Sequence, residues 1–170
     1  MGADIHMYIQ YRDKSRINTD HSWWRDFGGR INPGRNYDMF SVLAGVRGTA
    51  DKGFEPKGIP DFELSWHAQS SLYLIITEDG KDEDCCTLEQ AESWGKPIIK
   101  NALGKPIKTL HPDLHSHSWL TVKELEQAYR WYKKESEYGI GLEYRVLLKI
   151  MKELEDKGKN EVVVVFWFDN

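Results

Sequence analysis

The feature that most constrains the fold is an apolar run near the C-terminus, Val162 to Phe168, with sequence VVVVFWF. It lacks the alternation of polar and apolar residues that is typical of a strand with one solvent-facing side, so we predict a central strand buried on both faces. The run is far shorter than the ~20 residues needed to cross a bilayer. It therefore predicts a sheet interior rather than a membrane anchor.

The N-terminal segment, Ala3 to Tyr11, predicts a second long strand. Its odd-numbered residues are apolar, whereas Asp4, His6, Tyr8 and Gln10 fall on the opposite face. A charged face in a core strand needs partners, because burying an unpaired charge is costly. We therefore expect this strand and the C-terminal one to be neighbours in the interior of one sheet, with Asp4 near an end or a cleft.

Helices are predicted in three places where apolar residues recur at helical spacing. One spans Asn36 to Val46, with Asn36 as N-cap and Gly48 as terminator. A capping box formed by Thr121 and Glu124 opens a second. Its apolar face comprises Val122, Leu125, Ala128, Tyr129 and Tyr132. A third helix carries Leu147, Ile150, Met151 and Leu154 and ends at Gly158.

The remaining segments carry weaker patterns. Arg12 to Arg35 is expected to be a loop with at most a short hairpin, Leu72 to Thr77 a strand and Thr87 to Trp94 a short helix. Lys96 to Pro112 is expected to be a loop, with a small strand over Pro97 to Lys100. The order of elements predicts an α+β fold, a single domain over residues 1–170 with one mixed sheet and helices packed on it.

Composition excludes several classes of protein. With 40% apolar and 29% charged residues among 170, the chain is typical of a globular protein rather than a disordered one. A net charge of −4 argues against bulk nucleic-acid binding. The two cysteines, Cys85 and Cys86, are adjacent and predict no structural disulfide. The N-terminus has no pattern of a signal peptide, so we expect a cytoplasmic protein without membrane contact.

Two segments predict a polar site with metal or catalytic chemistry. Asp4 and His6 share the polar face of the first strand, and His115 and His117 are expected on one side of an extended segment. Asp and His are ligands for Zn or Mn, so these four residues predict a metal site that activates water. The alternative is that the histidines hydrogen-bond the backbone and fix the start of the following helix.

A third cluster predicts anion binding. Arg35, Asn36 and Tyr37 open the first helix, and Arg47 follows its far end. An arginine beside a helix N-terminus binds phosphate or carboxylate through its guanidinium and the free backbone N–H groups. Ser116 and Ser118, which alternate with the two histidines, complete the predicted ligand-binding set. Alternatively, Arg35 pairs with Asp38 or points into solvent.

Four sequence segments are similar to segments of a known protein family: GADIH at the start, GRNYDMFSVLAGVRG, HSHSWLT and the closing VVVVFWFDN. Together they resemble a family of small proteins encoded by bacteriophages and prophages for which no activity is established. The resemblance implies an accessory protein that acts in the host cytosol. It assigns no catalytic residue.

Three functions remain open from the sequence. The first is a small hydrolase that acts on a nucleotide or phosphoester, with the metal held by the Asp and His residues and the substrate held by arginines. The second is a non-catalytic binder of a nucleotide-like signal or of a host protein, as in counter-defence. The third is a homo-oligomeric interaction module without a small ligand.

Overall fold

The first and last strands of the chain pair along their whole length at the centre of a four-stranded sheet. A computed structural model describes residues 2–17 and 23–169. Strands β1 (Asp4–Asp13) and β8 (Asn160–Asp169) run antiparallel, in register from Asp4 opposite Asp169 to Asp13 opposite Asn160. Strands β2 (Arg25–Ile31) and β7 (His115–Thr121) flank them in the order β2-β1-β8-β7. The predicted central pair is thus confirmed.

Three helices cover one face of this sheet: α1 (Tyr37–Ala44), α4 (Val122–Glu135) and α5 (Leu142–Asp156). They bury the largest core cluster together with Ile5, Met7, Phe166 and Phe168 of the central strands. Helix α1 ends earlier than predicted. Gly45, with φ 65°, takes the left-handed C-cap position, and its N–H donates to the carbonyl of Ser41, so Gly48 lies outside the helix.

The predicted start and inner face of α4 are confirmed. Thr121 and Glu124 form the reciprocal capping box, and the five predicted apolar residues are the buried residues of the helix. In α5 the predicted core residues Leu147 and Met151 are buried, whereas Ile150 and Leu154 are half-buried. Tyr144, one turn before Leu147, completes the buried face of α5.

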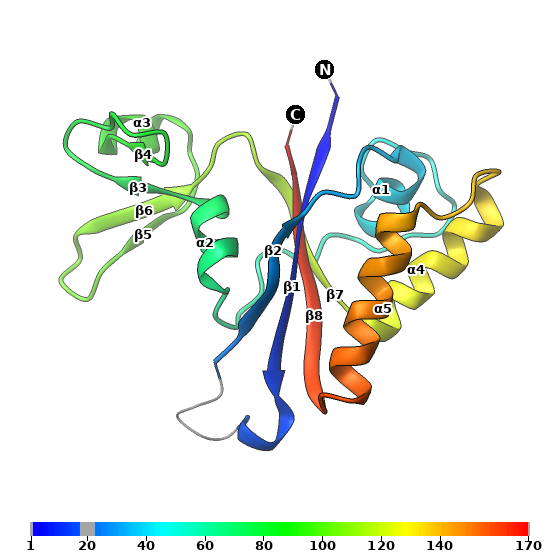
Figure 1. Cartoon of the computed structure of the whole chain (residues 1–170). Helices are drawn as coiled ribbons and strands as arrows, with labels where there is room; N and C mark the ends of the chain where they lie inside the picture. The colour runs from blue at the N-terminus through cyan, green and yellow to red at the C-terminus, as the bar shows by residue number, and fades with distance from the viewer. Residues whose placement is uncertain (1, 18–22, 170) are drawn as a thin grey trace.

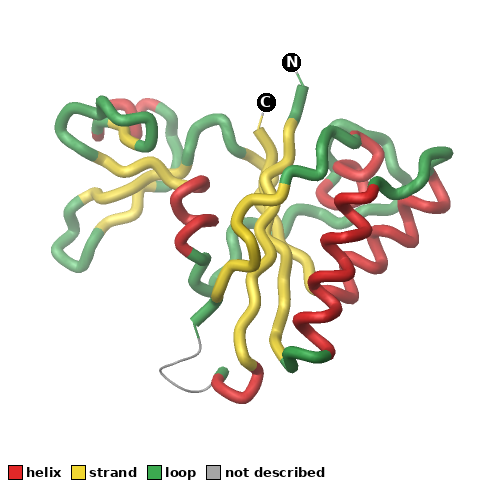
Figure 2. The backbone as a smooth tube through the Cα atoms, in the orientation of Figure 1, coloured by secondary structure: helices red, strands yellow, loops and turns green. Residues whose placement is uncertain are grey.

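The fold class is α+β as predicted, but the chain forms two sheets rather than one. A smaller sheet, order β4-β3-β6-β5, lies beyond the opposite face of the central sheet (Figures 1 and 2). Its strands are β3 (Tyr73–Ile76), β4 (Cys85–Cys86), β5 (Ile98–Lys100) and β6 (Pro106–Leu110), accompanied by helices α2 (Trp66–Leu72) and α3 (Leu88–Ser93). Both cysteines are free thiols.

Two strands occupy segments that were expected to be mainly loop. Strand β6 lies within Lys96–Pro112, where Lys108 and Thr109 interrupt the apolar pattern. Strand β2 lies within Arg12–Arg35 and contains Gly28 and Gly29, both with positive φ, where the register with β1 shifts. Backbone pairing rather than side-chain pattern defines both strands. No helix in the described ranges is long and apolar enough to span a membrane.

Candidate functional site

Polar side chains at one end of the central sheet form a chain of charged hydrogen bonds. Arg35 donates to both carboxylate oxygens of Asp4, at 2.6 Å from Nε and 3.0 Å from Nη2. The backbone N–H of Asp4 donates to Asp169 Oδ1 at 2.9 Å. The hydrogen bond from Arg35 lowers the pKa of Asp4. Arg35 therefore pairs with Asp4 of the first strand rather than with Asp38, while 55% of its side chain stays exposed to solvent.

The imidazole of His6 belongs to the same chain of contacts. Its Nε2 lies 2.8 Å from Asp169 Oδ2, and only 11% of its side chain is exposed. The ring stacks on Trp167, with 6.4 Å between ring centroids. Burial lowers the pKa of His6, and Asp169 opposes that shift. The other ring nitrogen, Nδ1, is buried and has no hydrogen-bond partner among the described residues, so His6 is held through Nε2 alone.

The two histidines of β7 do not lie on the same side, so the expectation from the extended pattern is wrong. Ser116 adopts φ 50°, and the pairing with β8 jumps from His115–Phe168 to Ser118–Phe166. This bulge places His115 against Phe168, on the face covered by α1, α4 and α5. His117 packs against Trp167, which belongs to the core cluster of the other face. An inserted residue shifts the side-chain alternation by one position.

The predicted metal site is not formed by the described residues. Within residues 2–17 and 23–169, no three His, Cys, Asp or Glu side chains come together as possible metal ligands. Asp4 is held by Arg35, His6 is held by Asp169, and His115 faces away from His117. Burial, Lys96 and His115 lower the pKa of His117 to about 4, so its imidazole is neutral at pH 7.

Of the predicted ligand-binding residues, three line one groove and three do not. Arg35, Asn36 and Tyr37 line a groove of about 500 Å³ between the start of α1 and the α4–α5 connection. Ser116 contacts His115 Nδ1 at 2.9 Å, and Ser118 is buried and accepts the backbone N–H of Lys57. Arg47 follows α1 with φ 59° and is not among the lining residues.

Tyrosines dominate the walls of this groove, which we call the tyrosine groove. Besides the three predicted residues, its lining comprises Pro33, Asp38, Tyr132, Tyr138, Gly139, Gly141 and Tyr144. Asn36 has a structural role there: Oδ1 accepts the N–H of Met39 and Nδ2 donates to the hydroxyl of Tyr132, both at 3.0 Å. The sequence pattern marked Tyr132 as a core residue and did not identify Tyr138 or Tyr144.

Tyr144, another lining residue of the tyrosine groove, carries a buried polar group. Its side chain is 1% exposed, and its hydroxyl has no hydrogen-bond partner. Burial raises its pKa well above the ordinary value. At the rim, by contrast, Tyr138 is 75% exposed. Tyr138 therefore offers an accessible aromatic ring, whereas the hydroxyl of Tyr144 lies in the protein interior.

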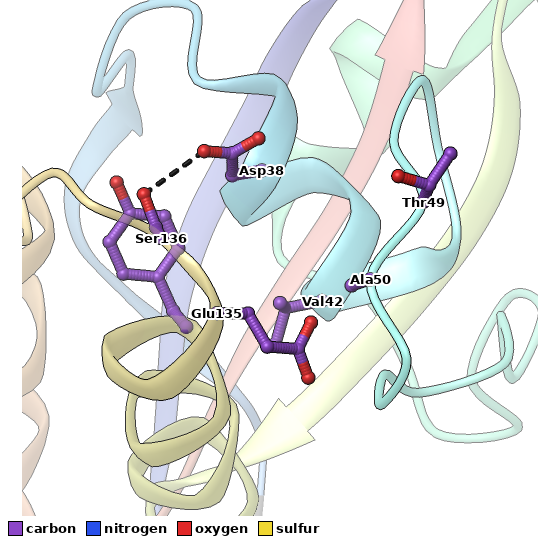
Figure 3. Close-up of a pocket in the computed structure, with 7 residues that line it drawn as sticks. Asp38, Val42, Thr49, Ala50, Glu135 and Ser136 are labelled. Atoms are coloured by element: carbon purple, nitrogen blue, oxygen red, sulfur yellow. Dashed lines mark hydrogen bonds between the residues drawn. The ribbon is translucent and has the colours of Figure 1, made fainter.

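A second, smaller cavity shares Asp38 and Tyr132 with the tyrosine groove (Figure 3). Its volume is about 100 Å³, and Ser136 closes one side by donating from its hydroxyl to Asp38 Oδ2 at 3.0 Å. Glu135 accepts the backbone N–H of Asp51 at 3.1 Å. This space accommodates water molecules, whereas ligand pockets usually measure about 300–1,000 Å³.

One polar constellation on the other face was missed by the sequence analysis. His67 Nδ1 lies 2.6 Å from Asp26 Oδ2, and the Ser65 hydroxyl donates to the other oxygen of Asp26. The serine bonds the carboxylate rather than the imidazole, so the nucleophile–base contact of hydrolases is lacking here. Ser65 also caps α2, so this cluster fastens α2 to β2. Sequence spacing alone could not reveal that His67 has a partner 41 positions away.

Comparison with protein-family models, curated proteins and solved structures finds no match to this chain. The resemblance to the phage-encoded family therefore stays a prediction.

Proposed function

We propose that this protein binds a nucleotide, or a similar small anionic ligand with a planar ring, in the tyrosine groove, without turning it over. The observation that carries the proposal is the combination of three kinds of group in about 500 Å³: the tyrosines, the guanidinium of Arg35 and the carboxylate of Asp38. A volume of this size suits a small ligand.

Each kind of group matches one part of a nucleotide. Tyrosine rings stack on a base, and Tyr138 is exposed enough to do so. Arg35 uses Nε and Nη2 for Asp4, which leaves Nη1 to donate to a phosphate oxygen. The second oxygen of Asp38, which Ser136 does not use, is free to accept from a ribose hydroxyl or an exocyclic amine.

A binding role suits the groups that line the groove better than a hydrolytic one. Among its described lining residues, Asp38 is the one carboxylate, and there is no imidazole or thiol. General acid–base catalysis works best with a group whose pKa lies near the operating pH, whereas an ordinary tyrosine hydroxyl titrates near pH 10. Binding needs only stacking, charge and shape.

Isothermal titration calorimetry with AMP, adenosine and inorganic phosphate tests the proposal. We expect AMP to bind, Tyr138→Ala to weaken it about tenfold because one stacked ring is lost, and Tyr138→Phe to retain it. Arg35→Lys keeps a charge for Asp4 but loses the planar fork. The Arg35→Lys variant should therefore lose more affinity for AMP than for adenosine.

The matched control is Trp66→Ala, which removes a 74% exposed ring from α2, away from the tyrosine groove. It should leave the affinity unchanged. Absence of AMP binding at millimolar concentration, or equal losses in Tyr138→Ala and Trp66→Ala, would overturn the proposal. Release of phosphate or nucleoside during incubation with the purified protein would replace the binding role by a hydrolytic one.

A further inference from the structure

Positive charge is concentrated along a groove between α4 and α5. This basic groove has a volume of about 380 Å³. Tyr129, Ile140 and Leu148 contribute apolar surface to it. Its cationic lining residues are Arg130, Lys133, Arg145, Lys149 and Lys152.

Most of this charge is not neutralised within the described chain. Lys152 pairs with Glu126, the one acidic lining residue. The other four cations are exposed and have no ion-pair partner among the described residues. The whole chain has a net charge of −4, so the groove opposes the overall sign. A basic rim around an apolar floor fits an acidic segment that also carries an apolar side chain.

The opposite end of the same molecule carries such a segment. Residues 78–89, which we call the acidic tip, connect β3 to β4 and enter α3. Their exposed acidic residues are Glu78, Asp79, Asp82, Glu83, Asp84 and Glu89. Leu88 is 38% exposed and lines the same surface hollow as Glu78 and Glu89. The basic residues nearby are Lys81, which pairs with Asp79, and Lys105.

We propose that the basic groove receives the acidic tip of a second copy of this chain. The small sheet with α3 and the helix pair α4–α5 lie at opposite ends of the molecule (Figure 1). One chain therefore cannot close the contact on itself. The association is head-to-tail, so a row of any length keeps one free tip at one end and one free groove at the other. Since the contact is mainly electrostatic, rising salt weakens it.

Sedimentation velocity of two complementary variants tests this assembly. The groove variant, Arg145→Glu/Lys149→Glu, keeps its tip, and the tip variant, Asp82→Asn/Glu83→Gln, keeps its groove but presents no new positive charge to the altered groove. We expect the unmodified protein to form species that grow with concentration at low salt and dissociate at high salt. Each variant alone should be monomeric. An equimolar mixture should form dimers and nothing larger, because one intact tip meets one intact groove.

The matched control is Lys14→Glu/Lys52→Glu, which makes the same charge reversal at exposed positions outside the basic groove. It should associate like the unmodified protein. A monomer at all concentrations and salt levels, or a mixture that stays monomeric while both variants are folded by circular dichroism, would overturn the proposal. So would a groove that binds a fluorescent single-stranded oligonucleotide while the chain stays monomeric, since the occupant would then be a nucleic acid.

Discussion

His6 Nε2 lies 2.8 Å from Asp169 Oδ2, which joins two side chains 163 positions apart in the chain. The other oxygen of Asp169 accepts the backbone N–H of Asp4. A single carboxylate at the end of β8 thus satisfies two donors of β1, and it fixes the ends of the two central strands relative to each other.

Asp169→Asn should destabilise the protein by about 1 kcal/mol, since a hydrogen bond to a charged acceptor becomes a neutral one. It should also lower the pKa of His6, because Asp169 favours the protonated imidazole. Urea unfolding measures the first effect and NMR titration of the ring measures the second. Asp156→Asn, at an exposed position in the last turn of α5, is the control. Equal stability of both variants would contradict this role of Asp169.

The parts of the fold that were predicted from the sequence are those with a strong local signal. The run from Val162 to Phe168 places β8 in the sheet interior because no polar residue interrupts it. The capping box of Thr121 and Glu124 defines the start of α4 because its hydrogen bonds are local. In such segments neighbouring residues carry all the information that is needed.

The parts that were missed depend on long-range contacts. The bulge at Ser116 places His115 and His117 on opposite faces of the sheet. Nothing in the sequence HSHS distinguishes a bulged strand from a regular one. Asp4 finds Arg35 and His6 finds Asp169 through the folded sheet, so two predicted metal ligands have other partners. Likewise, the tyrosine groove forms where Tyr138 and Tyr144 approach the start of α1, about 100 positions earlier in the chain.

Loss of the α4 cap should have a moderate cost. Thr121→Ala removes the hydroxyl that accepts the N–H of Glu124 and should lower the free energy of unfolding by about 1 kcal/mol. Thr121→Ser keeps the acceptor and should be close to the unmodified protein. Urea unfolding of the three proteins checks this expectation. An Ala variant as stable as the Ser variant would show that the cap contributes nothing measurable.

Core leucines of the two long helices should matter more than the cap. Leu125 is fully buried and Leu147 is 1% exposed. Each truncation to Ala should cost roughly 2–5 kcal/mol, because it removes buried methyl groups and leaves a cavity. The control is Leu103→Ala, at a position that is 92% exposed, where no comparable loss is expected. Losses below about 0.5 kcal/mol at both buried sites, within the range of surface changes, would contradict the packing described.

Burial of neutral histidines makes stability depend on pH in a defined direction. His117 is held neutral because burial is the largest cause that lowers its pKa to about 4, assisted by the positive charge of Lys96. An unfolded histidine titrates near pH 6.5. Below that value the unfolded chain binds a proton that the folded chain does not, so the free energy of unfolding falls with decreasing pH until the folded pKa is reached.

His117→Gln should therefore lose less stability than the unmodified protein between pH 7 and pH 4. One unit of pKa corresponds to about 1.4 kcal/mol of unfolding free energy. Because water screens a partly exposed ring, we expect His117 to account for a loss of about 2 kcal/mol between pH 7 and pH 4. Urea unfolding at several pH values gives the difference between the two proteins. Leu114→Ala, which removes a buried apolar side chain but no titrating group, should show an offset that does not change with pH. A difference for His117→Gln that is equally flat would mean that this imidazole is not held neutral by the fold.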